Sequence, residues 1–171
     1  MSIPSEAWLR GPIDGIAPML QPLAYALIQA QEDVEAALAG VSTEVLWQRQ
    51  HGAASAGFHA LHMAGALDRL FTYARGEGLT DAQKVSARAE AQDSGMDAAV
   101  LLAVVRAQVD RAMDQLRNTD VNTLLDDRRI GRAGLPATVM GALVHGAEHT
   151  ARHAGQCVTT IKILKTSLGK R

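Results

Sequence analysis

The sequence has little of what marks several large classes of protein. It contains one cysteine, so an intramolecular disulfide is impossible, which fits a reducing compartment. Aromatic residues make up only 4% of the chain, and no apolar run approaches the roughly 20 residues that a membrane span needs. Seventeen Lys and Arg stand against eighteen Asp and Glu, without the long basic run typical of nucleic-acid binding. We therefore expect a cytoplasmic protein with no membrane or nucleic-acid partner.

Apolar side chains, by contrast, are plentiful. They make up 47% of the 171 residues, which is enough for a sizeable core in a chain the size of one domain. No alternating run of β-branched or aromatic residues is long enough to predict a strand. The apolar residues instead recur at intervals of three and four, which is the period of a helix. We predict an all-α chain that folds as a single domain over residues 1–171.

Four long helices account for this periodicity. The first is expected over residues 18–39, with Gly40 as its C-terminal stop. Pro22 lies inside this range and requires either a later start or a kink. The other three are expected over residues 56–75, 96–118 and 136–166. Four long helices joined by connections of varied length predict a four-helix bundle.

The connections between these helices are less regular. Residues 43–49 are expected to form a short helix that buries Trp47. Residues 77–95 are polar and are read as a connection with a helical turn or more, since Thr80 and Gln83 have the spacing of a capping box. Residues 120–134 combine opposite charges with two glycines and are expected to form a loop.

The distribution of the histidines is unusual, because five of the six fall in two predicted helices. His145, His149 and His153 are four residues apart, and each such step advances only about 40° around a helix, so neighbours share a face. His59 and His62 form a second pair, three residues apart. Two imidazoles one turn apart can reach the same metal ion, and bundle cores hold metals between facing helices. The spacing indicates a metal site, with histidines that serve packing as the alternative.

Two other metal patterns fit this sequence poorly. A zinc protease needs a glutamate between its histidines in the pattern H-E-x-x-H, whereas residues 150–152 of this chain are Thr, Ala and Arg. A di-iron bundle needs Glu-x-x-His pairs, whereas Glu148 is followed three residues later by Ala151. We therefore expect neither.

The residues around the histidines resemble motifs of the DinB/YfiT-like family of metalloenzymes. Residues 148–156, EHTARHAGQ, are similar to the motif of the family's last helix, and residues 57–65, GFHALHMAG, to that of its second helix. The likeness continues in residues 68–70 and 73–76, and in Leu135-Pro136 before the last helix. The resemblance implies a four-helix bundle of up-down-down-up connection, commonly a homodimer, that holds a divalent metal on three histidines.

Carried over residue by residue, the implied metal ligands are His62, His149 and His153, with Zn or Ni the ions we most expect. His59 lies one turn from His62, so the identity of the ligand on that helix stays open. His62 is preferred because the small, apolar run after it matches the family better, and His59 then becomes its partner or a pocket residue. His145 departs from the minimal pattern and is either a pocket acid or base or a packing histidine.

Three further residues have two interpretations each. Cys157 extends the histidine row by one turn, and we expect a core thiol rather than a fourth ligand because the row has turned away from His149 by then. Arg69 and Tyr73 lie within about 20° of His62 around the helix. They could line the same groove, with Arg69 binding a substrate carboxylate. The alternative is an arginine at the bundle end and a tyrosine in ordinary packing.

Three neutral imidazoles leave at least one coordination position open, which suits catalysis better than a structural role. An open divalent metal lowers the pKa of a bound water or deprotonates a thiol. The resemblance implies transferases that use low-molecular-weight thiols such as bacillithiol or mycothiol. No carboxylate base is expected on the histidine face, which favours the thiol route. We expect a thiol-dependent S-transferase acting on a small-molecule substrate, with a metal-dependent hydrolase as the alternative enzyme and a non-catalytic, stress-related binding module as the alternative of another class.

Overall fold

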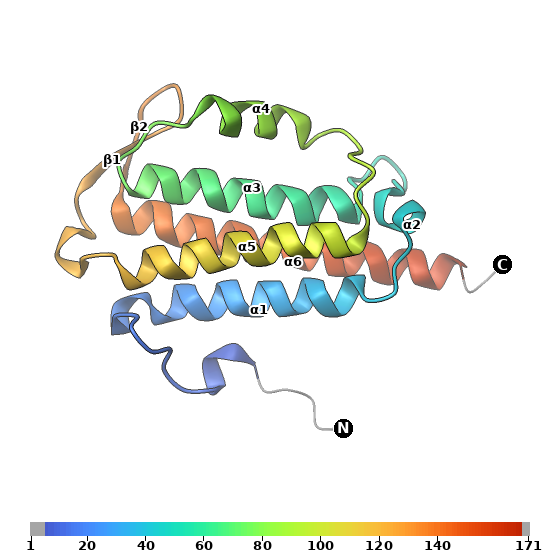
Figure 1. Cartoon of the computed structure of the whole chain (residues 1–171), viewed down its shortest axis with the longest axis horizontal. Coiled ribbons are helices and arrows are strands. Elements are labelled where there is room, and N and C mark those ends of the chain that lie inside the picture. Colours follow the sequence, from blue (N-terminus) through green and yellow to red (C-terminus); the bar gives the residue numbers. More distant parts are fainter. Residues whose placement is uncertain (1–5, 169–171) are drawn as a thin grey trace.

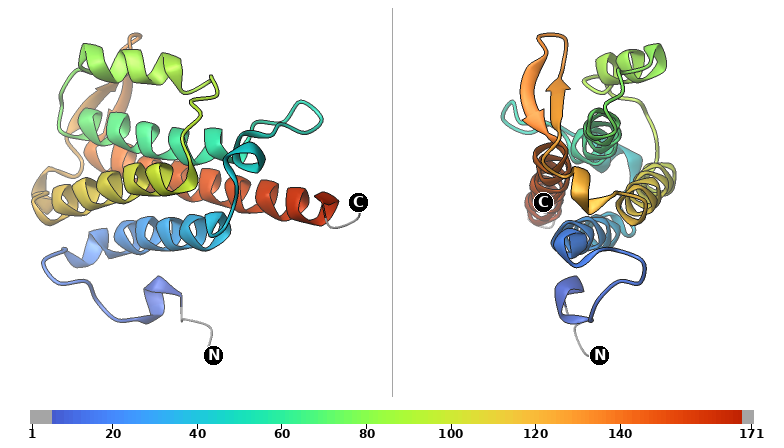
Figure 2. Two further views of the ribbon diagram at one scale, coloured as in Figure 1. Left: turned by 45° about the vertical axis from the view of Figure 1, so that its right-hand side comes forward. Right: turned by 90° about the vertical axis from the view of Figure 1, so that its left-hand side faces the viewer.

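Four long helices pack along one another in the computed structural model, which describes residues 6–168 (Figure 1). In sequence order, the first and the second of these long helices each pack on both the third and the fourth (Figure 2). The ends of the predicted domain, residues 1–5 and 169–171, lie outside the described part. The long helices are α1 (Gln21–Leu38), α3 (Ala56–Ala74), α5 (Ala98–Arg117) and α6 (Val139–Leu168).

Shorter elements connect them. Helix α2 (Thr43–Trp47) is capped by the Ser42 side chain and buries Trp47, as predicted. The indole Nε1 of Trp47 donates to the backbone oxygen of Met96, which ties this connection to the chain before α5. The remaining short helices are the 3-10 turns η1 (Ala7–Leu9), η2 (Pro18–Leu20) and η3 (Val121–Thr123). Within residues 6–168, none of the helices has both the length and the apolarity to cross a membrane.

Pro22 is accommodated by a later start of the first helix. The 3-10 turn η2 precedes α1, and Pro22 lies in the first turn of α1, where its missing N–H has no helical partner to lose. The buried Gln21 side chain holds the preceding loop by accepting from the Ile13 backbone N–H and donating to the Ile13 and Ile16 oxygens. At the other end Gly40 adopts a positive φ of 69°, as expected of a helix stop.

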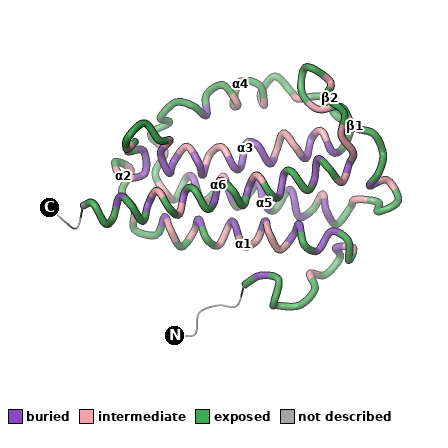
Figure 3. The backbone as a smooth tube through the Cα atoms, turned by 180° about the vertical axis from the view of Figure 1, so that it is seen from behind, coloured by how far each residue is buried: buried purple, intermediate pink, exposed green. Residues whose placement is uncertain are grey.

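The polar connection contains a complete helix, α4 (Asp81–Ala89), which lies outside the bundle against α3 (Figures 1 and 2). The predicted capping box between Thr80 and Gln83 is formed. None of the nine residues of α4 is buried, and Figure 3 shows it as mostly exposed. Polar contacts hold it instead: Nε2 of Gln83 donates to Asp68 Oδ2 at 2.7 Å and to Thr72 Oγ1 at 2.8 Å.

The expectation of a chain without strands was wrong. Strands β1 (Asp127–Ile130) and β2 (Leu135–Thr138) form an antiparallel hairpin in which Asp127 lies opposite Thr138. Each strand has only four residues and is largely exposed, so neither shows the long apolar alternation that predicts a strand. Gly131 and Gly134, with φ of 69° and 61°, make the turn that was expected to be a loop.

The hairpin also displaces the start of the last helix. Pro136, expected to open that helix, instead lies in β2 opposite Arg129, and α6 begins at Val139. Proline is tolerated in a two-stranded hairpin because a strand at a sheet edge does not need every N–H.

Helices α3 and α6 share the most extensive contact in the bundle. A Cβ atom on Gly146 of α6 would lie 2.9 Å from Cε2 of Phe71 on α3, closer than real carbon contacts allow. Phe71 itself is buried. The absence of a side chain at residue 146 therefore lets the aromatic ring of α3 pack directly on the backbone of α6.

We predict that Gly146→Ala lowers the free energy of unfolding by about 1–3 kcal/mol, the usual cost of overpacking a core. Urea denaturation followed by circular dichroism measures the change. Gly155→Ala on the same helix is the matched control, because a Cβ there meets no atom within 4 Å outside the helix backbone. The control is expected to be neutral or to stabilise by up to about 1 kcal/mol, since alanine favours a helix over glycine. Equal effects of the two substitutions would contradict the packing argument.

Candidate metal centre

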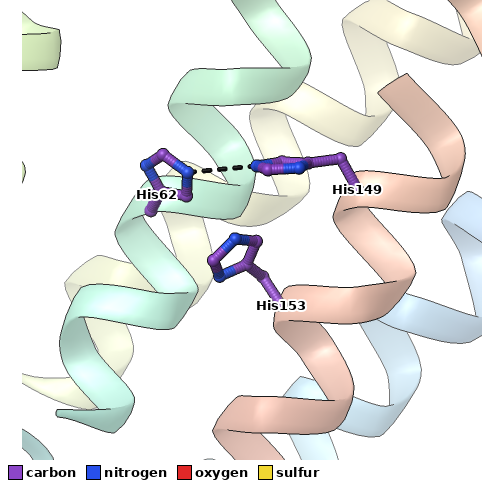
Figure 4. Close-up of side chains that lie close together, drawn as sticks. All are labelled: His62, His149 and His153. Atoms are coloured by element: carbon purple, nitrogen blue, oxygen red, sulfur yellow. Dashed lines mark hydrogen bonds between the residues drawn. The ribbon is translucent and has the colours of Figure 1, made fainter. Parts of the chain in front are cut away.

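The contact between α3 and α6 brings three of the histidines together. His62 projects from α3, and His149 and His153 project from α6, with the three rings turned toward one another (Figure 4). One ligand nitrogen from each lies within 4.8 Å of the other two. The ring centroid of His153 is 4.5 Å from that of His62 and 4.6 Å from that of His149. These three side chains could hold one metal ion.

The separation of the nitrogens fits an ion of zinc size. Nε2 of His62 lies 3.1 Å from Nε2 of His149 (Figure 4). Two nitrogens bound to one tetrahedral zinc at about 2.0–2.1 Å would lie about 3.3–3.4 Å apart. Nδ1 of His149 is buried and has no hydrogen-bond partner, which costs free energy in a folded protein. The ring is therefore not placed for stability alone.

The pKa values of His149 and His153 are both lowered, which favours their neutral rings. Burial, followed by the proximity of His62, lowers the pKa of His149. Burial, followed by the proximity of His62 and His149, lowers the pKa of His153 to about 4. A neutral imidazole keeps one nitrogen with a free lone pair, which a metal ligand needs.

The other two candidate histidines lie at the edges of this group. His59 is buried, and its Nδ1 lies 3.0 Å from Nδ1 of His153. Burial and the proximity of His62 lower the pKa of His59. The group of possible ligand atoms includes a nitrogen of His62 and none of His59. His145 is exposed one turn before His149, and its Nδ1 lies 3.5 Å from Glu148 Oε2.

A carboxylate that the sequence analysis missed completes the surroundings of His62. Glu90, the residue that follows α4, is only 3% exposed, and its Oε2 lies 2.8 Å from Nδ1 of His62. Arg69 binds the same carboxylate with both terminal nitrogens, Nη1 at 2.5 Å and Nη2 at 3.1 Å. Burial raises the pKa of Glu90, but the hydrogen bonds from His62 and Arg69 outweigh burial and leave it below the ordinary value. No carboxylate base was expected on the histidine face; Glu90 does contact His62, but its oxygens are bound by His62 and Arg69.

Gly65 is the residue that admits Glu90 to the surface of α3. A Cβ atom at this position would lie 2.0 Å from Oε1 of Glu90 and 2.9 Å from Nη1 of Arg69. Any side chain there would occupy the place of the carboxylate. The glycine was visible in the sequence next to the histidine pair, but it was not connected with a residue 25 positions later.

Arg69 and Tyr73 do not meet at the histidines. The guanidinium of Arg69 is occupied by Glu90, so it neutralises a carboxylate of the protein itself. Tyr73 is half-buried on α3, eleven residues after His62, which corresponds to about 16 Å along the helix axis. The shared groove proposed for these two side chains is not formed around the histidines.

A cavity of about 650 Å³ lies at the far part of α3 and α5, away from the three histidines. Arg75, Arg111 and Arg128 are among the residues that line it. A smaller cavity of about 140 Å³ beneath α4 is bordered by Glu90 and Gly65 and shares Asp68, Gln108 and Arg111 with the larger one. Of these two cavities, the smaller one lies nearer the histidines, behind Glu90.

Comparison with known proteins places this architecture in a family. The sequence model of the DinB superfamily matches residues 26–157, which include His62, His149 and His153. The chain belongs to the DinB superfamily. This confirms the resemblance seen in the motifs of α3 and α6. The match begins within α1 and ends at Cys157 in α6, so it includes α3 and α5 entirely and most of α1 and α6 in this DinB-superfamily protein.

A solved structure has the same fold. The crystal structure of a conserved protein from Enterococcus faecalis superposes with a TM-score of 0.73 and 18% sequence identity, covering 88% of this chain and 99% of the other. At this identity the likeness concerns the fold alone. No curated protein matches the chain.

Cys157 lies in the core, as expected, and outside the group of possible ligands. Its side chain is fully buried in α6, and burial raises the pKa of the thiol to about 12.

Because the thiolate is the reactive form of a cysteine, we predict that the native protein resists a colorimetric thiol reagent for hours at pH 8. When the protein is unfolded in guanidinium chloride, the same reagent should label one thiol per chain within minutes. Fast, stoichiometric labelling of the native protein would contradict this assignment.

Proposed function

We propose that this DinB-superfamily protein is a metal-dependent enzyme that holds one divalent ion, Zn or Ni, on His62, His149 and His153. The proposed activity is a thiol-dependent S-transfer to a small electrophilic molecule. The observation that supports it is the convergence of three imidazoles from two helices, with no fourth His, Cys, Asp or Glu in the group among the described residues. Structural zinc sites are usually closed by four protein ligands, whereas catalytic sites keep one position open.

The side chains around the histidines have distinct tasks in this proposal. A bound divalent ion would supply Lewis-acid activation of a thiol or a water at its open position. Glu90 holds the far nitrogen of His62, and His59 holds that of His153. The ring of Phe58 stacks on His62 at a centroid distance of 5.2 Å and an interplanar angle of 10°, which shields that side of the site from water.

The state of the nearby carboxylates favours thiol transfer over hydrolysis. Hydrolysis is assisted by a carboxylate that is free to accept a proton. Glu90 is bound by Arg69 and His62. Glu148 is hydrogen-bonded by Arg152, and this bond lowers the pKa of the Glu148 carboxyl. A thiol activated by the ion itself needs no separate base, so the transferase is preferred and the hydrolase is the alternative enzyme.

A binding module without catalysis is the alternative of another class. One observation favours it: the cavity of about 650 Å³ is lined by none of the three histidines. A stress-related protein could hold a ligand there, with the histidines serving only the contact between α3 and α6.

The finer description of the fold is part of the same proposal. The course of the ribbon in Figure 1, in which α3 and α5 run against α1 and α6, supports an up-down-down-up bundle. We further propose one domain over residues 1–171, a homodimeric assembly and a cytoplasmic location. Size-exclusion chromatography with light scattering tests the assembly.

The proposed site predicts one transition-metal ion per chain in untagged protein, measured by elemental analysis after purification and again after incubation with Zn or Ni. His149→Ala/His153→Ala should lose the ion, because a single remaining imidazole binds it far more weakly. His145→Ala is the matched control on the same helix, since its exposed ring lies outside the ligand group, and it should keep the ion. Wild-type protein that takes up no metal would reject the enzyme and favour the binding module.

Thiol transfer and hydrolysis predict different products from the same metal-loaded protein. With a panel of electrophiles and low-molecular-weight thiols, we expect thioether formation that depends on the ion and on the thiol, detected by mass spectrometry. His62→Ala should reduce this rate at least 100-fold. Simple esters and amides should stay intact. Hydrolysis of these without any thiol would contradict the transferase and support the hydrolase.

A further inference from the structure

We infer that Glu90 and His59 are positioning residues that preset the proton on each of two imidazoles, so that His62 and His153 present bare Nε2 atoms to one point before any metal arrives. This inference rests on the proposed metal site and deepens it, because it assigns work to two residues outside the ligand group. It concerns the metal-free protein, so it can be tested separately from metal binding.

The first half of the argument concerns His62. Two terminal nitrogens of Arg69 bind the Glu90 carboxylate, which keeps that group ionised and able only to accept hydrogen bonds. Nδ1 of His62, 2.8 Å from Oε2 of Glu90, must therefore carry the proton and donate it. A neutral imidazole protonated at Nδ1 has its lone pair at Nε2. That atom is the one 3.1 Å from Nε2 of His149, on the side where the three rings meet (Figure 4).

The second half concerns His153. Its Nδ1 lies 3.0 Å from Nδ1 of the buried His59, so one of these two nitrogens donates and the other accepts. Figure 4 shows the opposite edge of the His153 ring turned toward His62 and His149. We infer the direction in which Nδ1 of His153 donates, because only this direction leaves its Nε2 bare for an ion. His59 then accepts at Nδ1 and carries its own proton on Nε2.

The geometry around Glu90 indicates that the contact between Glu90 and His62 depends on specific features of the fold. The carboxylate comes from the end of an outer helix that buries none of its own residues. It reaches α3 because Gly65 has no side chain: a Cβ there would lie 2.0 Å from Oε1 of Glu90. Outer partners of this kind orient metal-binding histidines, and their removal typically costs 10–100-fold in metal affinity.

The test is a long-range proton–nitrogen correlation spectrum of ¹⁵N-histidine-labelled, metal-free protein at pH 7.5, assigned with single histidine substitutions. We expect His62 and His153 in the form protonated at Nδ1 and His59 in the form protonated at Nε2. In Glu90→Ala the His62 signals should move to a mixture of forms, while His153 and His59 keep theirs. In His59→Leu the change should fall on His153 and leave His62 unaffected.

Zinc affinity gives the second measurement, by competition with a chromophoric chelator. Glu90→Ala and Gly65→Ala should each weaken zinc binding 10–100-fold, the second because it displaces the carboxylate without removing it. Glu148→Gln, which alters an exposed carboxylate beside His149, is the matched control and should bind as the wild type does. Should Glu90→Ala fail to fold, the isosteric Glu90→Gln replaces it, with a smaller loss expected because one oxygen serves both His62 and Arg69.

The outcomes separate this inference from the proposed function. A wild-type spectrum with His62 protonated at Nε2, or a Glu90→Ala protein with unchanged His62 signals, would overturn the positioning role even if zinc binds. The expected proton positions in a protein that never takes up zinc would support the presetting and reject the metal enzyme.

Discussion

The close contact of α3 with α6 is the constraint on which the site depends. Both helices bury small residues, among them Ala60 and Ala64 on α3 and Ala147 and Ala154 on α6. Glycine at position 146 brings the two backbones close enough for an aromatic ring of α3 to rest on α6. Only such an approach lets short imidazole side chains from both helices place nitrogens about 3 Å apart. A metal tolerates errors of only about 0.2 Å in ligand distance. The packing of α3 on α6 therefore sets the geometry of the site.

The charges around the histidines are balanced before an ion enters. Burial lowers the pKa values of His149 and His153, because it makes a proton on either ring costly. The carboxylate that contacts His62, Glu90, is neutralised by Arg69. A divalent cation would bring two positive charges to a half-buried place. The Glu90 carboxylate, reached through the His62 ring, then offers the nearest negative charge, although Arg69 cancels part of its attraction at that distance.

The parts of the site that could be predicted from the sequence are those that lie on one helix. Four-residue spacing is enough to place His149 and His153 on a common face, and the motif resemblance added His62 from α3. Glu90 could not be predicted in this way, because it stands 28 residues after His62 and outside any long helix. Its position depends on how α4 folds back on α3, which local periodicity does not encode. Gly65 was the available signal, but a glycine in a helix does not say what fills its place.

The same distinction explains the fold. Long apolar rows predicted all four long helices, with ends that differ by a few residues from the structure. The hairpin before α6 escaped because its strands are short and exposed, and because Pro136 is as compatible with a helix start as with an edge strand. Where burial shapes the sequence pattern, the pattern predicts the element. Where the sequence pattern reflects an exposed turn with two glycines, it predicts only a break between elements.

Stability poorly explains the ion pair between the buried Glu90 and the half-buried Arg69. Moving two charges out of water costs about as much as their attraction returns, and apolar residues of similar volume often stabilise a fold equally well. The pair also secures a helix that contributes no buried residue of its own. The ion pair is better explained by the position that it gives to α4, which polar contacts through Gln83 and Glu90 hold against α3. Since one of these contacts also orients His62, a shift of α4 away from the bundle would release a ligand of the proposed metal centre.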